Sequence, residues 1–287
     1  MPALIHLLRP HQWLKNGFVF VGLLFGHAWH DPRIVGQTLA AFTAFCLLAS
    51  AVYVMNDLLD REQDRQHPKK KHRPLAAGTV NVSTAIALAV VCLLGGGALA
   101  VLYAGSAPWI FLAYVVMNIA YSLGLKHIVI LDVFIIASGF MLRILAGTLG
   151  VGIAPSHWLL LCGLMFTLFL GFAKRLAELN TLQKESGGHR RVLEHYTATM
   201  LDQFISITAA AAVISYALYT VSAETLALHG TRSLILTVPF VLYGMLRYLW
   251  RLHSQGGGGD AAQELLTDPH LVAAVAGWLV LVLVLLW

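Results

Sequence analysis

Apolar residues run in long stretches along this chain, and charged, glycine or proline residues end each stretch. A helix needs about 20 apolar residues to cross the hydrocarbon core of a membrane. The pattern predicts nine helices, at about residues 16–30, 34–56, 82–103, 108–124, 128–149, 156–175, 201–222, 232–250 and 270–287. We therefore expect an all-α, multi-pass membrane protein whose residues 1–287 form a single integral membrane domain.

Composition excludes the other broad classes of protein. Hydrophobic residues make up 58% of the chain and Asp, Glu, Lys and Arg only 11%, whereas a soluble protein carries about a quarter charged residues. No charged residue of these four types occurs between Arg73 and Lys126. Cys46, Cys92 and Cys162 are isolated within apolar stretches, which indicates neither a disulfide framework nor a Cys/His metal site.

Lysine and arginine fall mainly on one side of the nine predicted spans. With the N-terminus in the cytoplasm, 16 of them are cytoplasmic, Arg33 and Arg232 are outside, and Arg143 lies within the membrane. This is the positive-inside pattern. It predicts a cell (inner) membrane protein with a cytoplasmic N-terminus, and it explains the formal net charge of +5 without a nucleic-acid partner.

A cluster of carboxylates follows the second predicted span. Asp57, Asp60 and Asp64 lie at i, i+3 and i+7 after Asn56, so on a continuing helix they point the same way. Like charges on one face repel, and a helix C-terminus disfavours carboxylates. A bound divalent cation would reverse both effects, since Mg²⁺ takes one or two carboxylates together with substrate phosphates. The alternative is a solvated acidic helix end that the basic loop behind it balances.

A second group of polar residues lies between the fourth and fifth predicted spans. Tyr121 and Lys126 are followed by Asp132, four residues into the next apolar stretch. A carboxylate inside a span costs about 2.5 to 3.5 kcal/mol on insertion scales, so it usually faces a polar cavity or a partner. The alternative is a charge that begins a helix near the membrane interface. Two acidic helix ends with nearby cations suit a magnesium diphosphate.

At these residues the sequence resembles the UbiA superfamily of intramembrane prenyltransferases, and most closely its branch of decaprenyl-phosphate phosphoribosyltransferases. Ile136 stands where a second aspartate is usual in the aromatic prenyltransferases, which favours the phosphoribosyltransferase branch. The matching residues are Arg9–Asn16, Asn56, Asp57, Asp60, Asp64, His67, Pro68, Arg73, Pro74, Gly78, Tyr121, Ser122, Leu125, Lys126, Asp132, Gly139, Phe140, Arg143, Gly147, Lys174, Arg175, Glu178, Leu179, Glu264–Leu266, Asp268 and Pro269. The resemblance implies a helical bundle around a central cavity open to the cytoplasm.

The resemblance also implies an activity and a set of site residues. The reaction is Mg²⁺-dependent transfer of 5-phosphoribose from phosphoribosyl diphosphate to a polyprenyl phosphate of decaprenyl type, with release of diphosphate. Asp57, Asp60, Lys126 and Asp132 are the expected catalytic residues, and Asp57, Asp60 and Asp64 the expected metal ligands. The expected substrate-binding residues are Lys15, Asn56, Lys71, Arg73, Tyr121, Arg143, Lys174 and Arg175.

Several alternatives stay open at this point. Arg143 lies 11 residues beyond Asp132, about 16 Å along a straight helix, so it either binds substrate or caps polar groups inside the bundle. Residues 57–81 and 174–200 are expected to be cytoplasmic loops or caps over the cavity, although the second segment is equally well explained as a solvated connector. A prenyltransferase acting on an aromatic or other small acceptor is the nearest rival function, and a transporter is a more distant one. Homo-oligomer formation is left open.

Overall fold

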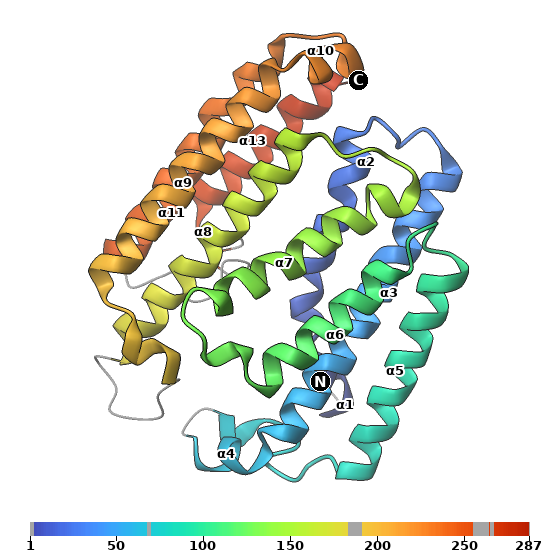
Figure 1. The fold of residues 1–287 in the computed structure, drawn as a ribbon, viewed down its shortest axis with the longest axis vertical. Helices are drawn as coiled ribbons and strands as arrows, with labels where there is room; N and C mark the ends of the chain where they lie inside the picture. The colour runs from blue at the N-terminus through green and yellow to red at the C-terminus, as the bar shows by residue number, and fades with distance from the viewer. Residues whose placement is uncertain (1–2, 68–69, 183–190, 255–263, 265–266, 287) are drawn as a thin grey trace. The chain divides into compact units, whose positions relative to one another are not determined.

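The computed structural model describes residues 3–67, 70–182, 191–254, 264 and 267–286, and within these ranges every regular element is a helix (Figure 1). The chain divides into two compact units. Unit 1 comprises residues 1–125 and 142–154, and unit 2 comprises residues 126–141 and 155–287. The predicted all-α fold class is confirmed.

Unit 1 is built on two long helices that lie side by side, α3 and α5 (Figure 1). Asp31 begins α3 because its carboxylate accepts hydrogen bonds from the backbone N–H groups of Arg33 and Ile34, and Pro32 follows at the first helical position. The core contains Phe45, Phe111 and Tyr114, whose rings contact one another through Phe45. The elements are α1 (Ala3–Leu8), η1 (Pro10–Phe20), α2 (Val21–Phe25), α3 (Pro32–Leu59), α4 (Arg61–Gln66), η2 (Lys70–His72), α5 (Val82–Leu102), α6 (Trp109–Leu123) and η4 (Leu149–Val151).

Unit 2 is built on α8 and α9, which lie side by side along most of their lengths (Figure 1, yellow and orange). Its core includes Phe169, Phe172, Leu201 and Tyr248. The helix α7 (Leu131–Ala146) belongs to unit 2 as far as Met141 and to unit 1 beyond it, and η3 (Leu125–His127) spans the other boundary. The remaining elements are α8 (His157–Leu182), η5 (Arg191–His195), α9 (Ala198–Val221), α10 (Ala223–His229), η6 (Ser233–Thr237), α11 (Val238–Ser254) and α13 (Pro269–Leu286).

Seven of the nine predicted spans fall on helical segments that are long and apolar enough to cross a membrane. These segments are Pro32–Leu59, Val82–Leu102, Leu131–Val151, His157–Asn180, Ala198–Val221, Ser233–Ser254 and Pro269–Leu286. The prediction for 108–124 falls on the shorter apolar helix Trp109–Leu123. The prediction for 16–30 falls on the end of η1, a 3₁₀-helix, and on α2. A multi-pass membrane protein is therefore confirmed, whereas the count of nine spans is not.

Candidate active site

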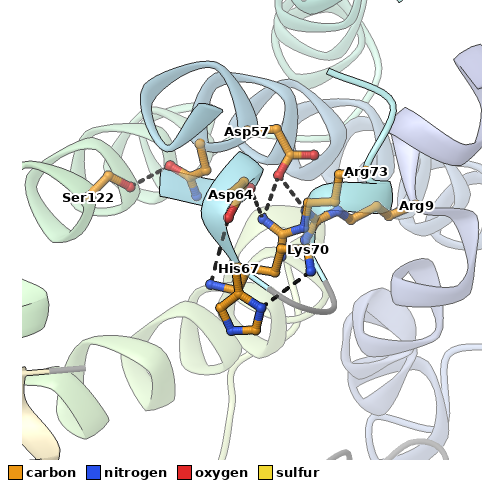
Figure 2. A network of polar contacts seen from close by, with 8 residues as sticks. Arg9, Asp57, Asp64, His67, Lys70, Arg73 and Ser122 are labelled. Carbon is orange, nitrogen blue, oxygen red and sulfur yellow. Dashed lines mark hydrogen bonds and ion pairs between the residues drawn. The ribbon is translucent and has the colours of Figure 1, made fainter. Parts of the chain in front are cut away.

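The first carboxylate cluster lies in unit 1, where α3 ends. Asp57 and Asp64 are only 3% and 2% exposed. Arg73 joins them, because its Nη1 lies 3.0 Å from Asp57 Oδ1 and 2.7 Å from Asp64 Oδ2 (Figure 2). Arg9 Nη2 lies 2.5 Å from the same oxygen of Asp57, and Lys70 Nζ lies 3.8 Å from Asp64 Oδ1. The two carboxylates are thus neutralised by three cations from two separate segments.

The local backbone explains how the two segments reach the carboxylates. Arg9 adopts a left-handed conformation, φ 52°, between α1 and η1, and its guanidinium stacks 5.1 Å from the ring centroid of Tyr53. On the other side, His67 Nδ1 accepts a hydrogen bond from the backbone N–H of Lys70 at 3.3 Å (Figure 2). The helix η2 packs against α4, and Arg73, the residue after η2, contacts Asp57.

The geometry differs from the sequence expectation at Asp60. The three aspartates were expected on one continuing helix, but α3 ends at Leu59 and α4 begins at Arg61. Asp60 lies between the two helices with φ −90° and ψ 4°, and its backbone N–H donates to the carbonyl of Asn56. This break corrects the assumption of a single helical face. Within the ranges that the structure describes, no group of three or more His, Cys, Asp or Glu side chains could hold a metal ion.

Two carboxylates that share one cation nevertheless suit a divalent ion. Carboxylate oxygens are the ligands that Mg²⁺ prefers, and one or two of them suffice when substrate phosphates complete the coordination. Arg73 already places a positive charge between Asp57 and Asp64. The donor set therefore fits a Mg²⁺ ion held by Asp57 and Asp64, with Asp60 on the adjoining turn.

The predicted residue Asn56 links this cluster to α6. Its Oδ1 accepts a hydrogen bond of 2.6 Å from Ser122 Oγ (Figure 2). Ser122 Oγ also lies 2.9 Å from the carbonyl oxygen of Asn118. Ser122 follows the predicted residue Tyr121, which is half-buried. The end of α6 is thus held against the carboxylate cluster in unit 1.

A second cluster lies wholly within unit 2. Asp132, in the first turn of α7, and Arg175, in α8, are both 0% exposed. Arg175 Nε donates to Asp132 Oδ2 at 2.7 Å, and Arg175 Nη1 donates to Glu178 Oε2 at 2.6 Å. Tyr196 donates from its hydroxyl to Asp132 Oδ1 at 2.9 Å. Burial raises the pKa of Tyr196 above its usual value, so the hydroxyl keeps its proton.

Asp132 and Arg175 were predicted as a catalytic and a substrate-binding residue. The structure brings them together, although their direct contact with substrate stays a prediction. Because both groups are fully buried, the charge of each is compensated by the other within the protein. Glu178 is the member of this cluster that reaches solvent, with 27% of its side chain accessible.

Arg143 lies inside unit 1 rather than in either cluster. Its Nε donates to Asn16 Oδ1 at 2.7 Å and its Nη2 to the Tyr114 hydroxyl at 3.1 Å. The guanidinium also stacks on the rings of Phe45 and Tyr114, at 5.3 and 4.7 Å from their centroids. These contacts favour the interpretation left open by the sequence in which Arg143 caps polar groups in the bundle interior.

A glycine makes the contact of Arg143 with Asn16 possible. A Cβ atom on Gly147 would lie 1.7 Å from the carbonyl oxygen of Val19. The absence of a side chain lets the end of α7 approach η1 backbone to backbone, which is where glycine has a specific structural use. Asn16, three residues before Val19, then lies within reach of Arg143.

The remaining predicted residues are placed as follows. Lys15 lies half-buried on η1 and Lys71 is exposed on η2, both in unit 1. Lys126 lies half-buried on η3 and Lys174 half-buried on α8, both in unit 2. The catalytic role of Lys126 and the substrate-binding roles of the other three lysines stay predictions.

Two residues gained importance only from the structure. The sequence marks Arg9 only as one cytoplasmic cation in the N-terminal motif, and its contact with Asp57 spans 48 residues. Tyr196 belongs to none of the sequence motifs. It contacts Asp132 across 64 residues, and a single tyrosine outside any motif carries no signal that a sequence pattern can detect.

Comparisons with known proteins extend this picture. The UbiA prenyltransferase family matches residues 17–267. The chain is 34% identical over 284 residues to a decaprenyl-phosphate phosphoribosyltransferase of Corynebacterium glutamicum, which covers 96% of this chain and 84% of that relative. It is 32% identical over 288 residues to the protein of the same description from Mycolicibacterium smegmatis, covering 96% and 90%. A solved structure of a UbiA homologue from Archaeoglobus fulgidus, bound to GPP and Mg²⁺, has a TM-score of 0.71, 18% identity, and coverage of 99% and 96%.

Proposed function

The chain belongs to the UbiA prenyltransferase family, and from this premise we propose that it transfers 5-phosphoribose from phosphoribosyl diphosphate to a polyprenyl phosphate. The family predicted from the sequence motifs is confirmed. One observation carries the proposal for this branch of the family. The relatives described as decaprenyl-phosphate phosphoribosyltransferases align with 96% of the chain at 32% to 34% identity.

In the proposed reaction, the bond between C1 of the ribose and the diphosphate oxygen breaks, and the electron pair leaves with the diphosphate. A phosphate oxygen of the acceptor forms the new bond to C1. Because the acceptor is already an anion, the reaction requires no general base. The main task of the protein is to stabilise the negative charge that develops on the leaving diphosphate.

The first cluster has the residues for that task. Asp57 and Asp64, with Asp60 beside them, would hold Mg²⁺, which when bound supplies electrostatic stabilisation of the leaving diphosphate. Arg9 and Arg73 are partly exposed, at 22% and 28% of their side chains. Their guanidinium groups can bind phosphate oxygens in bidentate fashion once a substrate competes with the carboxylates. The Mg²⁺ and GPP bound to the Archaeoglobus fulgidus homologue support a metal diphosphate in this fold.

An apolar cavity in unit 2 supports a lipid acceptor. It has a volume of about 150 Å³ and lies between α8, α11 and α13. Its lining includes Phe166, Phe169, Phe240, Met245, Tyr248 and Trp278. All three helices contain predicted membrane-spanning segments, so the lining and surroundings of this cavity suit a short stretch of the hydrocarbon chain of a polyprenyl phosphate.

The proposal includes an orientation in the membrane. Sixteen lysines and arginines on one side of the predicted spans favour a cytoplasmic N-terminus, a cytoplasmic active site and insertion in the inner membrane. In this orientation residues 57–81 and 174–200 lie on the cytoplasmic side, as the loops or caps expected from the sequence. In the second segment, residues 174–182 continue α8, and residues 183–190 lie outside the described residues.

The test is a transfer assay with the purified protein in detergent. Labelled phosphoribosyl diphosphate and Mg²⁺ are supplied with and without polyprenyl phosphate, and label in the lipid phase is counted. We expect transfer that requires the polyprenyl phosphate and stops with EDTA. A parallel assay supplies a prenyl diphosphate and 4-hydroxybenzoate, because the family is named for prenyl transfer. Prenylation in that assay, with no label moved in the first, would replace the proposed function with prenyl transfer.

A further inference from the structure

Ile130 has an unusual backbone conformation in the segment that joins η3 to α7. Its φ is 68°, in the left-handed region, which β-branched residues rarely adopt because the side chain crowds the backbone. The conformation therefore needs support from its surroundings. Lys126 lies on η3, four residues before Ile130, and α7 begins at Leu131.

Tyr196 supplies a contact at this position. The backbone N–H of Ile130 donates to the Tyr196 hydroxyl at 2.6 Å. The same hydroxyl donates to Asp132 Oδ1, and the ring is 4% exposed. A tyrosine hydroxyl has one proton to donate and lone pairs to accept, so both contacts form at once.

The contacts continue from Tyr196 into α8. Asp132 accepts from Arg175, and Arg175 donates to Glu178. The Tyr196 hydroxyl thus contacts Ile130 and Asp132 directly, and Asp132 connects it to Arg175 in α8. Lys126, expected to be catalytic, lies on η3, and Lys174, expected to bind substrate, lies on α8.

We infer that Tyr196 is a positioning residue for the transfer reaction. Its hydroxyl holds the backbone between Lys126 and α7 in a fixed position relative to the Asp132–Arg175 pair. This inference rests on the proposed function for the identity of the substrate. Tyr196 acts through the backbone of Ile130 and through Asp132, and it needs no contact with substrate. By the same geometry, Asp132 orients Arg175 and the neighbouring turn of α8.

The test is the variant Tyr196→Phe, which keeps the buried ring and removes the hydroxyl. Hydrogen exchange of the peptide covering residues 126–134 should become faster, because the Ile130 amide loses its acceptor. The KM for phosphoribosyl diphosphate should rise about tenfold with little change in kcat, as expected when a contact common to the bound and transition states weakens. The matched control is Tyr219→Phe, whose hydroxyl contacts His229 in the same unit. It should change neither measurement.

A second variant separates positioning from general loss of structure. Glycine adopts a positive φ without strain, so adding Ile130→Gly to Tyr196→Phe should return most of the lost donor affinity. Faster exchange in Tyr196→Phe with unchanged KM and kcat would overturn the inference, as would unchanged exchange. If the wild-type protein transfers a prenyl group instead of phosphoribose, the proposed function fails by itself. The KM and kcat of the wild type and the variants are then compared with the prenyl diphosphate as substrate. The hydrogen-exchange result does not depend on which substrate the protein uses.

Discussion

Each of the two units holds a buried aspartate bound by arginine, but the arginines differ in their access to solvent. Asp57 in unit 1 is 3% exposed and Asp132 in unit 2 is 0% exposed. The side chains of Arg9 and Arg73 are 22% and 28% exposed, whereas that of Arg175 is 1% exposed. An arginine that reaches solvent can exchange a carboxylate for a phosphate, while a sealed arginine can do so only if the core opens.

The physical reason is desolvation. Removing a charge from water costs several kcal/mol, and in a buried pair the partner compensates that cost only while both charges stay in place. The first cluster avoids the full cost because its cations remain partly hydrated. We therefore propose that the cluster in unit 1 binds substrate, and that the cluster in unit 2 positions other residues.

The largest effect is expected from Asp132→Ala, which removes one partner of the buried ion pair in unit 2. It leaves the buried Arg175 with only the partly exposed Glu178 as an ion-pair partner, so we expect a loss of about 3 kcal/mol in the free energy of unfolding. The measurement is thermal unfolding in detergent. The control is Asp202→Ala, because Asp202 is 45% exposed and pairs with the exposed His253. Equal unfolding temperatures for the two variants would mean that the Asp132–Arg175 pair does not stabilise unit 2.

The next effect concerns activity rather than stability. Asp57→Asn keeps the shape of the side chain and removes its charge, so we expect transfer at saturating Mg²⁺ to fall by about 100-fold or more. The unfolding temperature should change much less than in Asp132→Ala, because Arg9 and Arg73 regain water. Activity near that of the wild type would remove Asp57 from the metal site.

The smallest effect on stability is expected for a substitution on the surface of α4, the helix that carries Asp64. Glu62 pairs with Arg65 on the surface of α4, where the two side chains are 74% and 43% exposed. Glu62→Gln should change the free energy of unfolding by about 0.5 kcal/mol or less, since exposed pairs gain little over water. If Glu62→Gln lowered the free energy of unfolding as much as Asp132→Ala, solvent exposure would not explain how much an ion pair contributes to stability.

The sequence predicted those features that depend on residues close together in the chain. Apolar stretches predicted the seven long membrane-spanning segments, because each span is a local property of about 20 residues. The spacing of Asp57 and Asp64 placed both near one basic loop, and Arg73 from that loop contacts both. The break at Asp60 was missed, because nothing in the residue type distinguishes a short kink from a continuing helix.

Contacts between distant residues could not be predicted in this way. Arg143 and Asn16 are separated by 127 residues and Asp132 and Arg175 by 43. Each pair depends on how helices pack, and one sequence carries no record of which helices are neighbours. Asp132 was expected to face a polar cavity or a partner, and the structure supplies a partner, Arg175.

The 3₁₀ conformation of η1 determines which of its side chains lie on one face of the helix. A 3₁₀-helix has three residues per turn and rises about 2.0 Å per residue, compared with about 1.5 Å in an α-helix. Its side chains at i, i+3 and i+6 therefore form a straight row. Trp13, Asn16 and Val19 occupy such a row: the first two donate hydrogen bonds to Ser50 Oγ and Cys46 Sγ, and Val19 is buried in the core of unit 1.

The eleven residues of η1 and the five of α2 together extend about 30 Å, close to the thickness of the hydrocarbon core. A search tuned to 20-residue α-helical stretches underestimates the reach of this segment. Substitutions at every third residue of η1 should accordingly be the least tolerated. A mutational scan of residues 10–20 would therefore distinguish a 3₁₀-helix from an α-helix without a structure.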